Sequence, residues 1–189
     1  MIRLAAISLF FAILLLSGCS GNQSGEKQAG ETSLQANDTA KVGLAIGNRA
    51  PELAYTSPQG KIIALSEYRG KIVLVDFWAS WCLPCRIENP NLVHVYQNYQ
   101  DKTFVGGDGF TIYSVSLDSK KEAWTGAIEH DGLVWEAHVS DLKGFEAVPA
   151  AMYQVRSIPS NFLIDGNGII IAKNLRAEEL ERTIKSLVK

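Results

Sequence analysis

Residues 71–86 read KIVLVDFWASWCLPCR, and this stretch decides the fold. Its first half, Lys71–Trp78, is β-branched and almost continuously apolar, which is typical of a strand buried on both faces of a sheet. Its second half holds Cys82 and Cys85, where the strand gives way to a helix predicted over about 83–100. Chemistry in open α/β sheets gathers at the carboxyl ends of such strands, so the two cysteines are candidate functional residues.

The rest of the domain alternates between strand and helix patterns. Strands are expected as a hairpin of 53–55 with 62–65, at 110–117, near 135–139, and as a second hairpin of 161–165 with 169–173. Helices are expected from a capping box at Ser119–Glu122 to Gly132, near 146–154, and as a final amphipathic helix through Leu180, Ile184, Leu187 and Val188. Strand, helix and strand at this spacing require a parallel crossover. The predicted fold class is α/β, with a mixed central sheet, helices on both faces and an N-terminal β-hairpin extension.

Length, charge and cysteine count narrow the classes of protein. The 189 residues suit one domain with appendages. Eighteen basic and 20 acidic residues give a net charge of −2, which offers no electrostatic footprint for nucleic acid. Three cysteines are too few for a disulfide-dense scaffold. Two of them can pair, so the third needs another explanation.

The N-terminus supplies that explanation. Met1–Arg3 carries one positive charge, and Leu4–Leu16 is apolar except for Ser8. This is the pattern of a secretory signal, and the apolar run is too short to span a membrane well. The following Leu16-Ser-Gly-Cys19 resembles the lipobox of bacterial lipoproteins. That resemblance implies cleavage before Cys19 and a lipid anchor on this residue.

A polar segment of about 20–41, rich in Gly, Ser, Gln, Asn and Glu, follows the lipobox. Such a segment buries too little apolar surface to offset its ordering entropy, so it is interpreted as a flexible tether. The chain is therefore divided into a lipoprotein signal peptide (1–18), a lipidated cysteine with its tether (19–43) and one domain (44–189).

The Cys-x-x-Cys pair is best explained by redox chemistry. Cys82 falls at or near the start of the helix, where free N–H groups and the helix dipole favour the nucleophilic thiolate. Cys85 lies one turn further on, within reach for a disulfide, and Pro84 fits an early helical position. A purely structural disulfide across so short a loop would contribute only about 2 kcal/mol, against about 3 for a 15-residue loop.

Two metal-based alternatives compete with this interpretation. A structural zinc site needs four ligands, and the other candidates are the scattered His94, His130 and His138. Haem attachment requires a histidine directly after the second cysteine, where the chain has Arg86. A bound metal or haem is therefore not expected, and no cofactor beyond the cysteine pair is expected.

Several motifs now point to one family. Val73–Arg86, VLVDFWASWCLPCR, resembles the active-site segment of thioredoxins, and Ile46–Leu53 resembles the start of AhpC/TSA-related domains. Further motifs in the same order resemble the envelope-anchored TlpA and ResA type: Glu88–Leu92, Ser116–Asp118, Val155–Pro159 and Phe162–Asp165. The resemblance covers roughly residues 44–189 and implies a thioredoxin-like fold.

The family resemblance assigns roles to individual residues. It makes Cys82 the attacking thiol and Cys85 the resolving thiol. It makes Ile158–Pro159 a cis-proline dipeptide whose Ile158 backbone pairs with a bound substrate chain, and cis X–Pro bonds are uncommon and usually deliberate. Trp81 and Pro84 are the other expected substrate-binding residues.

Two acids are candidates for proton transfer with the resolving thiol. Asp76 interrupts an apolar strand and matches the buried carboxylate of thioredoxins. A desolvated carboxyl group has a raised pKa, which suits it to accept a proton from Cys85. Glu88 lies three residues after Cys85 on the same helix face and matches an acid of the TlpA and ResA type. A solvated surface residue is the alternative for Glu88.

The function that follows is thiol–disulfide exchange on protein thiols and disulfides of the bacterial cell envelope. The precedent of reductants that serve cytochrome c maturation favours a reductase with a membrane electron donor, either in that pathway or in general thiol reduction. Ala79 occupies the position where the peroxide-reducing branch has Thr or Ser, which argues against peroxidase activity. The alternative function is a module that binds or delivers a soft metal such as Cu(I) through the same cysteine pair.

Overall fold

The computed structural model describes residues 40–189. In chain order its elements are β1 (Ala54–Thr56), β2 (Ile62–Ala64), the 3-10 helix η1 (Leu65–Tyr68), β3 (Ile72–Trp78), α1 (Leu83–Tyr99), β4 (Thr103–Phe104), β5 (Gly107–Asp108), β6 (Phe110–Ser116), α2 (Lys121–His130), β7 (His138–Val139), the 3-10 helix η2 (Gly144–Glu146), α3 (Val148–Met152), β8 (Ser160–Ile164), β9 (Ile170–Lys173) and α4 (Ala177–Ser186). The predicted signal peptide and Cys19 lie outside the described residues. Within 40–189, no helix is long and apolar enough to cross a membrane.

Strand β3 is the middle of a five-stranded sheet with the order β7-β6-β3-β8-β9. It runs parallel to β6 and antiparallel to β8, and every one of its residues is buried. The predicted mixed sheet built around a doubly buried strand is confirmed. Because α1 leads from β3 towards the parallel β6, the cysteine pair falls at the carboxyl ends of these two strands.

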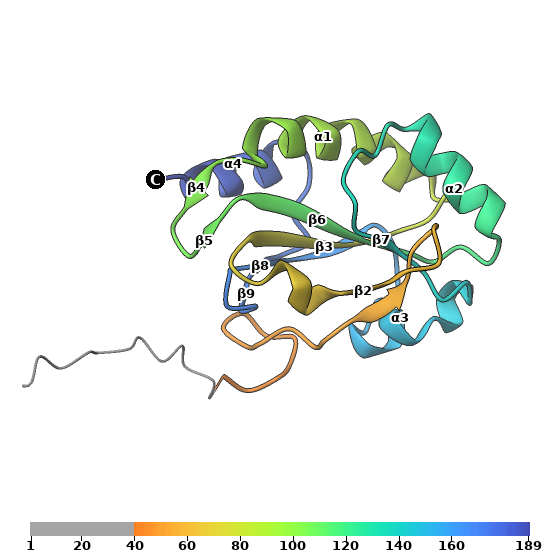
Figure 1. The fold of residues 1–189 in the computed structure, drawn as a ribbon, viewed down its shortest axis with the longest axis horizontal. Coiled ribbons are helices and arrows are strands. Elements are labelled where there is room, and N and C mark those ends of the chain that lie inside the picture. Colours follow the sequence, from red (N-terminus) through yellow and green to blue (C-terminus); the bar gives the residue numbers. More distant parts are fainter. Residues whose placement is uncertain (1–39) are drawn as a thin grey trace, which may run out of the picture. The chain divides into compact units, whose positions relative to one another are not determined.

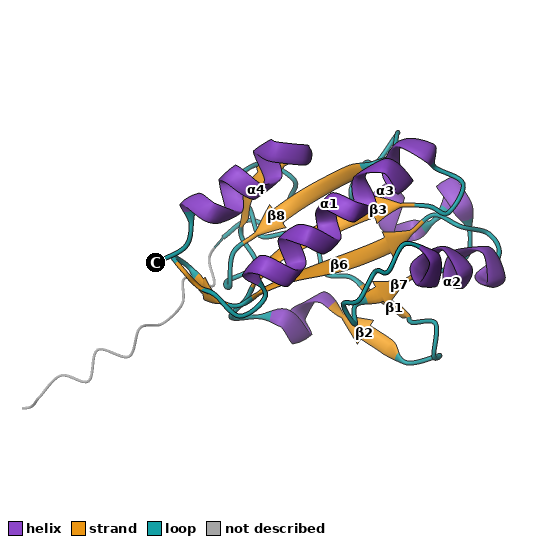
Figure 2. Ribbon diagram, turned by 90° about the horizontal axis from the view of Figure 1, so that it is seen from above, coloured by secondary structure: helices purple, strands orange, loops and turns teal. Residues whose placement is uncertain are grey.

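Helices cover both faces of this sheet. α1 and α4 lie on one face, and α3 and the β1–β2 hairpin lie on the other (Figure 1). α2 lies near β7, at one edge of the sheet (Figure 2). α4 buries Leu180 and Ile184 along one stripe, as predicted for an amphipathic helix. With neither face of β3 open to water, its almost continuously apolar sequence is explained, with Asp76 as the exception.

The predicted N-terminal hairpin is also confirmed, because β1 and β2 pair antiparallel as a separate two-stranded sheet. Two buried tyrosines fasten this region to the rest of the domain. The Tyr113 hydroxyl donates to the carbonyl of Ile63 at 2.8 Å, and the Tyr153 hydroxyl donates to the carbonyl of Pro51 at 2.6 Å. Burial raises the pKa of both phenols, so they stay neutral donors.

The start of α2 differs from the prediction. Its N-cap is Lys120, whose side chain makes no capping bond, so the predicted capping box of Ser119 and Glu122 is wrong. Asp118, two residues before this N-cap, explains the difference. Its N–H binds the Ser116 hydroxyl at 3.0 Å, which holds the chain at the end of β6 and delays the helix.

Other elements are shorter than expected or unexpected. β7 has two residues, and the helix expected near 146–154 is divided into η2 and the short α3. The glycine-rich segment before β6 forms the β4–β5 hairpin, which the sequence did not predict. Gly106 turns it with φ of +91°, and a Cβ on Gly107 would lie 2.9 Å from the Gly70 carbonyl oxygen. Both positions therefore need glycine.

The ordered domain also begins earlier than residue 44. The Arg49 N–H donates to the Lys41 carbonyl, and the Gly43 N–H donates to the Arg49 carbonyl, both at 3.0 Å. The last residues assigned to the tether thus pair with the domain.

Candidate functional site

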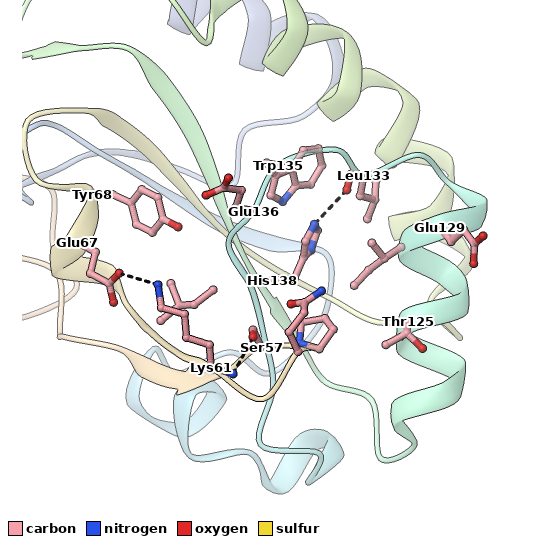
Figure 3. A pocket seen from close by; sticks show the side chains of 14 residues that line it. Ser57, Lys61, Glu67, Tyr68, Thr125, Glu129, Leu133, Trp135, Glu136 and His138 are labelled. Atoms are coloured by element: carbon pink, nitrogen blue, oxygen red, sulfur yellow. Dashed lines mark hydrogen bonds and ion pairs between the residues drawn. The ribbon is translucent and has the colours of Figure 1, made fainter.

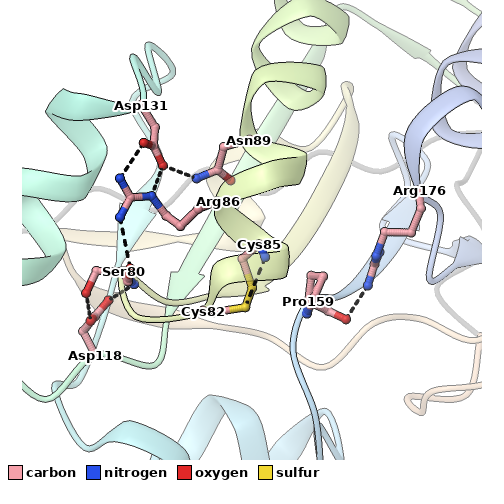
Figure 4. Close-up of a disulfide and its surroundings, with 9 residues drawn as sticks. All are labelled: Ser80, Cys82, Cys85, Arg86, Asn89, Asp118, Asp131, Pro159 and Arg176. Atoms are coloured by element: carbon pink, nitrogen blue, oxygen red, sulfur yellow. Dashed lines mark hydrogen bonds and ion pairs between the residues drawn. A yellow bond between two sulfur atoms is a disulfide. The ribbon is translucent and has the colours of Figure 1, made fainter.

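Cys82 and Cys85 form a disulfide at the amino end of α1, with their Cα atoms 5.3 Å apart (Figure 4). Cys82 is the N-cap residue, and its sulfur accepts a hydrogen bond from the Cys85 N–H at 3.2 Å. Pro84 occupies the first turn, where its missing N–H costs little. In the reduced protein, this N–H and the positive end of α1 both stabilise a thiolate on Cys82.

Ser80, two residues before Cys82, is held from two sides. The buried carboxylate of Asp118 accepts hydrogen bonds from the Ser80 N–H at 3.0 Å and from its hydroxyl at 2.5 Å. The guanidinium of Arg86 donates to the Ser80 carbonyl at 3.0 Å. One anion and one cation therefore fix the loop that presents the attacking cysteine.

Arg86 is itself anchored by Asp131, which follows the last residue of α2. The guanidinium binds both carboxylate oxygens, one of them through Nη2 at 2.6 Å, and Asn89 adds a donor at 2.7 Å. Burial would raise the pKa of Asp131, but the hydrogen bonds from Arg86, His130 and Asn89 outweigh burial and lower this pKa to about 2. This ion pair stays charged at neutral pH and joins α1 to α2.

Asp76 lies within β3, and only 4% of it is exposed. In the part of the chain that the structure describes, no group donates a hydrogen bond to its carboxyl. Burial raises its pKa to about 7, with the Arg176 charge lowering the pKa and the Glu88 charge raising it. A carboxyl that is half protonated near neutral pH is suited to give and take a proton.

Glu88 is half-buried and bound to the start of α4, so it is not a fully solvated side chain. Its Oε1 accepts from the Ala177 N–H at 2.8 Å and from the Asn91 side chain at 2.9 Å. Ala177 is the first residue of α4. The carboxylate thus satisfies an N–H at the start of α4, and it adds negative charge near Asp76.

The Ile158–Pro159 peptide bond is cis, as predicted. Both residues are half-buried, and Pro159 lies among the residues around the disulfide (Figure 4). The Pro159 carbonyl accepts a hydrogen bond from the guanidinium of Arg176. Arg176 also donates to the Leu175 carbonyl at 2.6 Å. The cis-proline loop is thereby attached to the residue that precedes α4.

The rim of the disulfide is apolar and exposed. Trp81 is 56% exposed and Leu83 is 69% exposed, and Pro84 between the two cysteines is exposed as well. The Trp81 ring packs against Phe145 of η2, with centroids 5.7 Å apart. Exposed apolar side chains around a reactive group mark a surface that binds other molecules.

Comparison with known proteins agrees with this geometry. The sequence profile of the AhpC/TSA family matches residues 46–173. The thiol-disulfide oxidoreductase ResA of Geobacillus kaustophilus is 32% identical over 152 residues, or 79% of this chain and 82% of that protein. ResA of Bacillus thuringiensis subsp. konkukian is 29% identical over 181 residues, or 96% of this chain and 94% of that protein. The thioredoxin domain of a thiol-disulfide oxidoreductase from Bacteroides vulgatus is 37% identical with a TM-score of 0.69, covering 78% of this chain and all of that domain.

The chain belongs to the AhpC/TSA family. It is a thiol–disulfide oxidoreductase of the ResA type, it has the thioredoxin-like fold, and Cys82–Cys85 is its Cys-x-x-Cys disulfide. The interpretation of the cysteine pair as redox-active rather than purely structural is confirmed.

The histidines of this AhpC/TSA protein do not gather with the cysteines. His94 contacts Asn98, His130 lies beside Asp131, and His138 is buried in β7. Within residues 40–189, no group of three or more His, Cys, Asp and Glu side chains is arranged to hold a metal ion. The described domain thus offers no set of four zinc ligands.

A cavity of about 700 Å³ lies elsewhere in the fold, between the β1–β2 turn, the end of α2 and the segment before β7 (Figure 3). Its buried part includes Trp135 and His138, and its rim includes Glu129 and Glu136. Burial lowers the pKa of His138 to about 4, so its ring is neutral and donates from Nε2 to the Leu133 carbonyl at 3.2 Å. No residue of the cysteine or cis-proline loops lines this cavity, so it is separate from the exchange site.

Sequence reasoning placed Cys82, Cys85, Trp81, Pro84 and the cis-proline dipeptide around one end of the sheet, and the structure brings these together. It missed residues that hold them in place: Asp118, Asp131, Phe145 and Arg176. Only Asp118 carried a signal, as the last residue of the Ser116–Asp118 motif. The others come from distant segments, and no local pattern points to the cysteines.

Proposed function

We propose that this protein is an envelope-anchored thiol–disulfide reductase that acts on protein disulfides through Cys82 and Cys85. The observation that carries the proposal is the cysteine pair at the start of α1, with a buried carboxyl at Asp76 and a cis-proline loop beside it. These are the parts that disulfide exchange needs: a stabilised thiolate, a proton acceptor and a binding edge.

In the reduced protein, the Cys82 thiolate attacks one sulfur of a substrate disulfide. A bond forms between Cys82 Sγ and that sulfur, the substrate S–S bond breaks, and the other substrate sulfur leaves and takes up a proton. The Cys85 thiolate then attacks Cys82 Sγ, the mixed disulfide breaks, and the substrate leaves as a dithiol. Two electrons pass from the protein to the substrate, so a membrane dithiol donor must reduce Cys82–Cys85 again.

Asp76 is the proposed acceptor of the Cys85 proton in the second step. Cys85 is 1% exposed, so bulk water has little access to its thiol. A carboxyl with a pKa near 7 matches the working pH and loses its own proton easily. Glu88 is assigned a supporting role, because its carboxylate already binds the first residue of α4.

The substrate chain is proposed to lie across the exposed apolar rim. Trp81 and Pro84 supply the apolar surface next to the attacking sulfur, while the backbone of Ile158 and Pro159 supplies the edge for main-chain pairing. Protein substrates with apolar side chains beside their cysteines fit this rim. Burying those side chains and Trp81 together is favourable by about 25 cal/mol for each Å² of apolar surface.

For location, we propose removal of residues 1–18, lipidation of Cys19 and a tether that ends near residue 41. The support is the run Leu4–Leu16 followed by Leu16-Ser-Gly-Cys19. Lipid on Cys19 would hold the domain at the outer side of a bacterial membrane, because several acyl chains together anchor stably. Replacing Cys19 by Ala should move the protein from the membrane to the soluble fraction of the envelope.

Two measurements test the reaction. Cys82→Ser should abolish reduction of insulin and of model disulfides, and Cys85→Ser should accumulate mixed disulfides on a non-reducing gel. Cys-x-x-Cys proteins span about −270 to about −120 mV, so a reductase should lie near the lower end. A potential near the upper end would contradict the direction. Tight stoichiometric Cu(I) binding without disulfide reduction would contradict the reaction itself.

A further inference from the structure

Arg176 stands outside every motif of the sequence and yet reaches the active-site loop. It precedes α4, and its half-buried guanidinium donates from two nitrogens to two carbonyl groups, those of Pro159 and Leu175. Figure 4 shows the bond to Pro159. It has no carboxylate within ion-pair distance among residues 40–189. The two carbonyl groups therefore hold the guanidinium in place, and no carboxylate among these residues forms an ion pair with it.

The backbone on one side of Arg176 is fixed to β8, the strand that follows the cis-proline, and on the other side it is fixed to α1. The Asn161 side chain donates to the Leu175 carbonyl and accepts from the Leu175 N–H, both at 2.9 Å. On the other side, the Ala177 N–H is held by Glu88 at 2.8 Å. Arg176 is thus clamped between β8 and α1, and the position of its guanidinium is set by both.

The same strand places Asp76 next to this clamp. In the β3–β8 pairing, Asp76 lies directly opposite Asn161, so the two side chains share one face of the sheet. Asn161 spends one amide donor and its amide oxygen on Leu175. Asp76 receives no hydrogen bond from Asn161, so the pKa of its carboxyl depends on its burial and on the charges of Arg176 and Glu88.

Two charged groups act on Asp76 from the elements packed around it. Glu88 of α1 carries the negative charge, and Arg176, which precedes α4, carries the positive charge. Arg176 favours the ionised carboxyl, and both burial and Glu88 oppose ionisation.

We propose that Arg176 is a positioning residue of the exchange reaction, which fixes the Pro159 carbonyl in the substrate-binding loop and places a permanent positive charge beside the buried carboxyl of Asp76. The inference rests on the proposed roles of Asp76 and of the cis-proline loop. One guanidinium thus couples the edge that binds substrate to the group that accepts the proton.

The two halves of this role separate by substitution. Arg176→Lys keeps the charge but loses the planar fork that spans two carbonyls. Arg176→Gln loses the charge and keeps a single donor group. Arg182→Gln, at an exposed arginine within α4, removes the same charge away from the site and serves as the matched control.

The direct measurement is the carboxyl ¹³C NMR titration of Asp76 in the full mature chain. We expect Arg176→Gln to raise the titration midpoint of Asp76 by about one pH unit, because a nearby cation is lost. Arg176→Lys should leave the midpoint within a few tenths of a unit, and Arg182→Gln should leave it unchanged. Kinetics add a second readout: the pH profile of mixed-disulfide resolution should move with the midpoint, and both Arg176 variants should raise KM several-fold.

Distinct outcomes overturn distinct claims. An unchanged Asp76 midpoint in Arg176→Gln, or an equal shift in Arg182→Gln, overturns the role of Arg176. A shifted midpoint with an unchanged pH profile of resolution supports the coupling of Arg176 to Asp76 and overturns the catalytic assignment of Asp76. If Arg176→Gln fails to fold, Arg176→Lys still decides: a raised KM with an unshifted midpoint supports the positioning role, and an unchanged KM overturns it.

Discussion

Two arginines flank the disulfide, and they are bound in opposite ways. Arg86 forms a two-point ion pair with Asp131 and holds the Ser80 carbonyl, so its positive charge is paired with a carboxylate. Among residues 40–189, Arg176 donates only to carbonyls, and Asp76, an acid on which its charge acts, lies buried without a hydrogen bond. We call the Arg86 side the complete side, because its arginine is paired with a carboxylate, and the Arg176 side the poised side, because Asp76 there can still gain or lose a proton.

This difference divides the site between geometry and proton chemistry. On the Arg86 side, the pKa of Asp131 is about 2, so this carboxylate keeps its charge in the physiological range and continues to hold Arg86. On the Arg176 side, the pKa of Asp76 is about 7, so its charge changes there. A nucleophile benefits from a fixed position, and a proton acceptor benefits from a balanced equilibrium.

The largest expected effect is on the poised side. Because the pKa of Asp76 is raised in the folded state, its contribution to stability is complete below about pH 4 and is lost as pH rises through about 7. Asp76→Asn removes this loss. In the oxidised protein, the free energy of unfolding of the variant minus that of the wild type should be larger at pH 8 than at pH 4 by up to about 4 kcal/mol. Urea unfolding at both pH values measures this.

The exposed Asp101→Asn is the matched control, and it should show no pH-dependent gain. An Asp76→Asn gain of equal size at pH 4 and pH 8 would contradict the raised pKa, because the cost of ionising Asp76 in the folded state depends on pH in this window and is absent from the variant.

The next effect concerns Asp131 on the complete side, and its dependence on pH is opposite to that of Asp76. The pKa of Asp131 is lowered in the folded state, so its stabilisation is present above about pH 4 and is lost as pH falls through about 2. Asp131→Asn should lower the free energy of unfolding by about 2 kcal/mol at pH 7. The difference from the wild type should shrink as the pH falls from 4 to 2. Thermal unfolding across that range checks it, and a constant difference would show that the ion pair is not its source.

A smaller effect is expected one step further along the Arg86 side. Ser80→Ala removes the hydroxyl bond to Asp118 but leaves the Ser80 N–H bond and the Ser116 hydroxyl on the same carboxylate. We expect a loss of about 1 kcal/mol in the free energy of unfolding, because the anion keeps most of its donors. Slower alkylation of Cys82 in this variant would show that Ser80 also positions the thiol. A stability equal to that of the wild type would show that the hydrogen bond from the Ser80 hydroxyl to Asp118 does not stabilise the fold.

The sequence predicted what depends on local pattern. The strand Ile72–Trp78 is almost continuously apolar because β3 is covered on both faces, and the spacing of Cys82 and Cys85 places both at the start of α1. The N-terminal hairpin followed from two short apolar runs around a Ser-Pro-Gln-Gly turn. In each case, neighbouring residues determine the outcome, so periodicity and turn chemistry were sufficient.

What the sequence could not predict depends on contacts between distant segments. Arg176 binds the cis-proline loop and Asp131 binds Arg86 only because the fold brings the starts of α4 and β8 together and places the end of α2 beside α1. Ser119 and Glu122 fit the pattern of a capping box, but the contacts of Asp118 with Ser116 and Ser80 decided where α2 begins. Glu88 matched an acid of the family, but its bond to the Ala177 N–H involves a helix that starts 89 residues later.

The smallest expected effect is a shift of the Asp76 pKa in the direction opposite to that expected for the loss of Arg176. Glu88→Gln keeps an oxygen to accept from the Ala177 N–H but removes the negative charge that raises the pKa of Asp76. The Asp76 titration midpoint should therefore fall by a few tenths of a pH unit, opposite to the direction expected for the loss of Arg176. The start of α4 should lose only about 0.5 kcal/mol, because an amide oxygen interacts less well with the helix dipole than a carboxylate does. The same ¹³C titration measures this shift, and an upward movement in Glu88→Gln would mean that Asp76 responds to packing at this site and not to the charges around it.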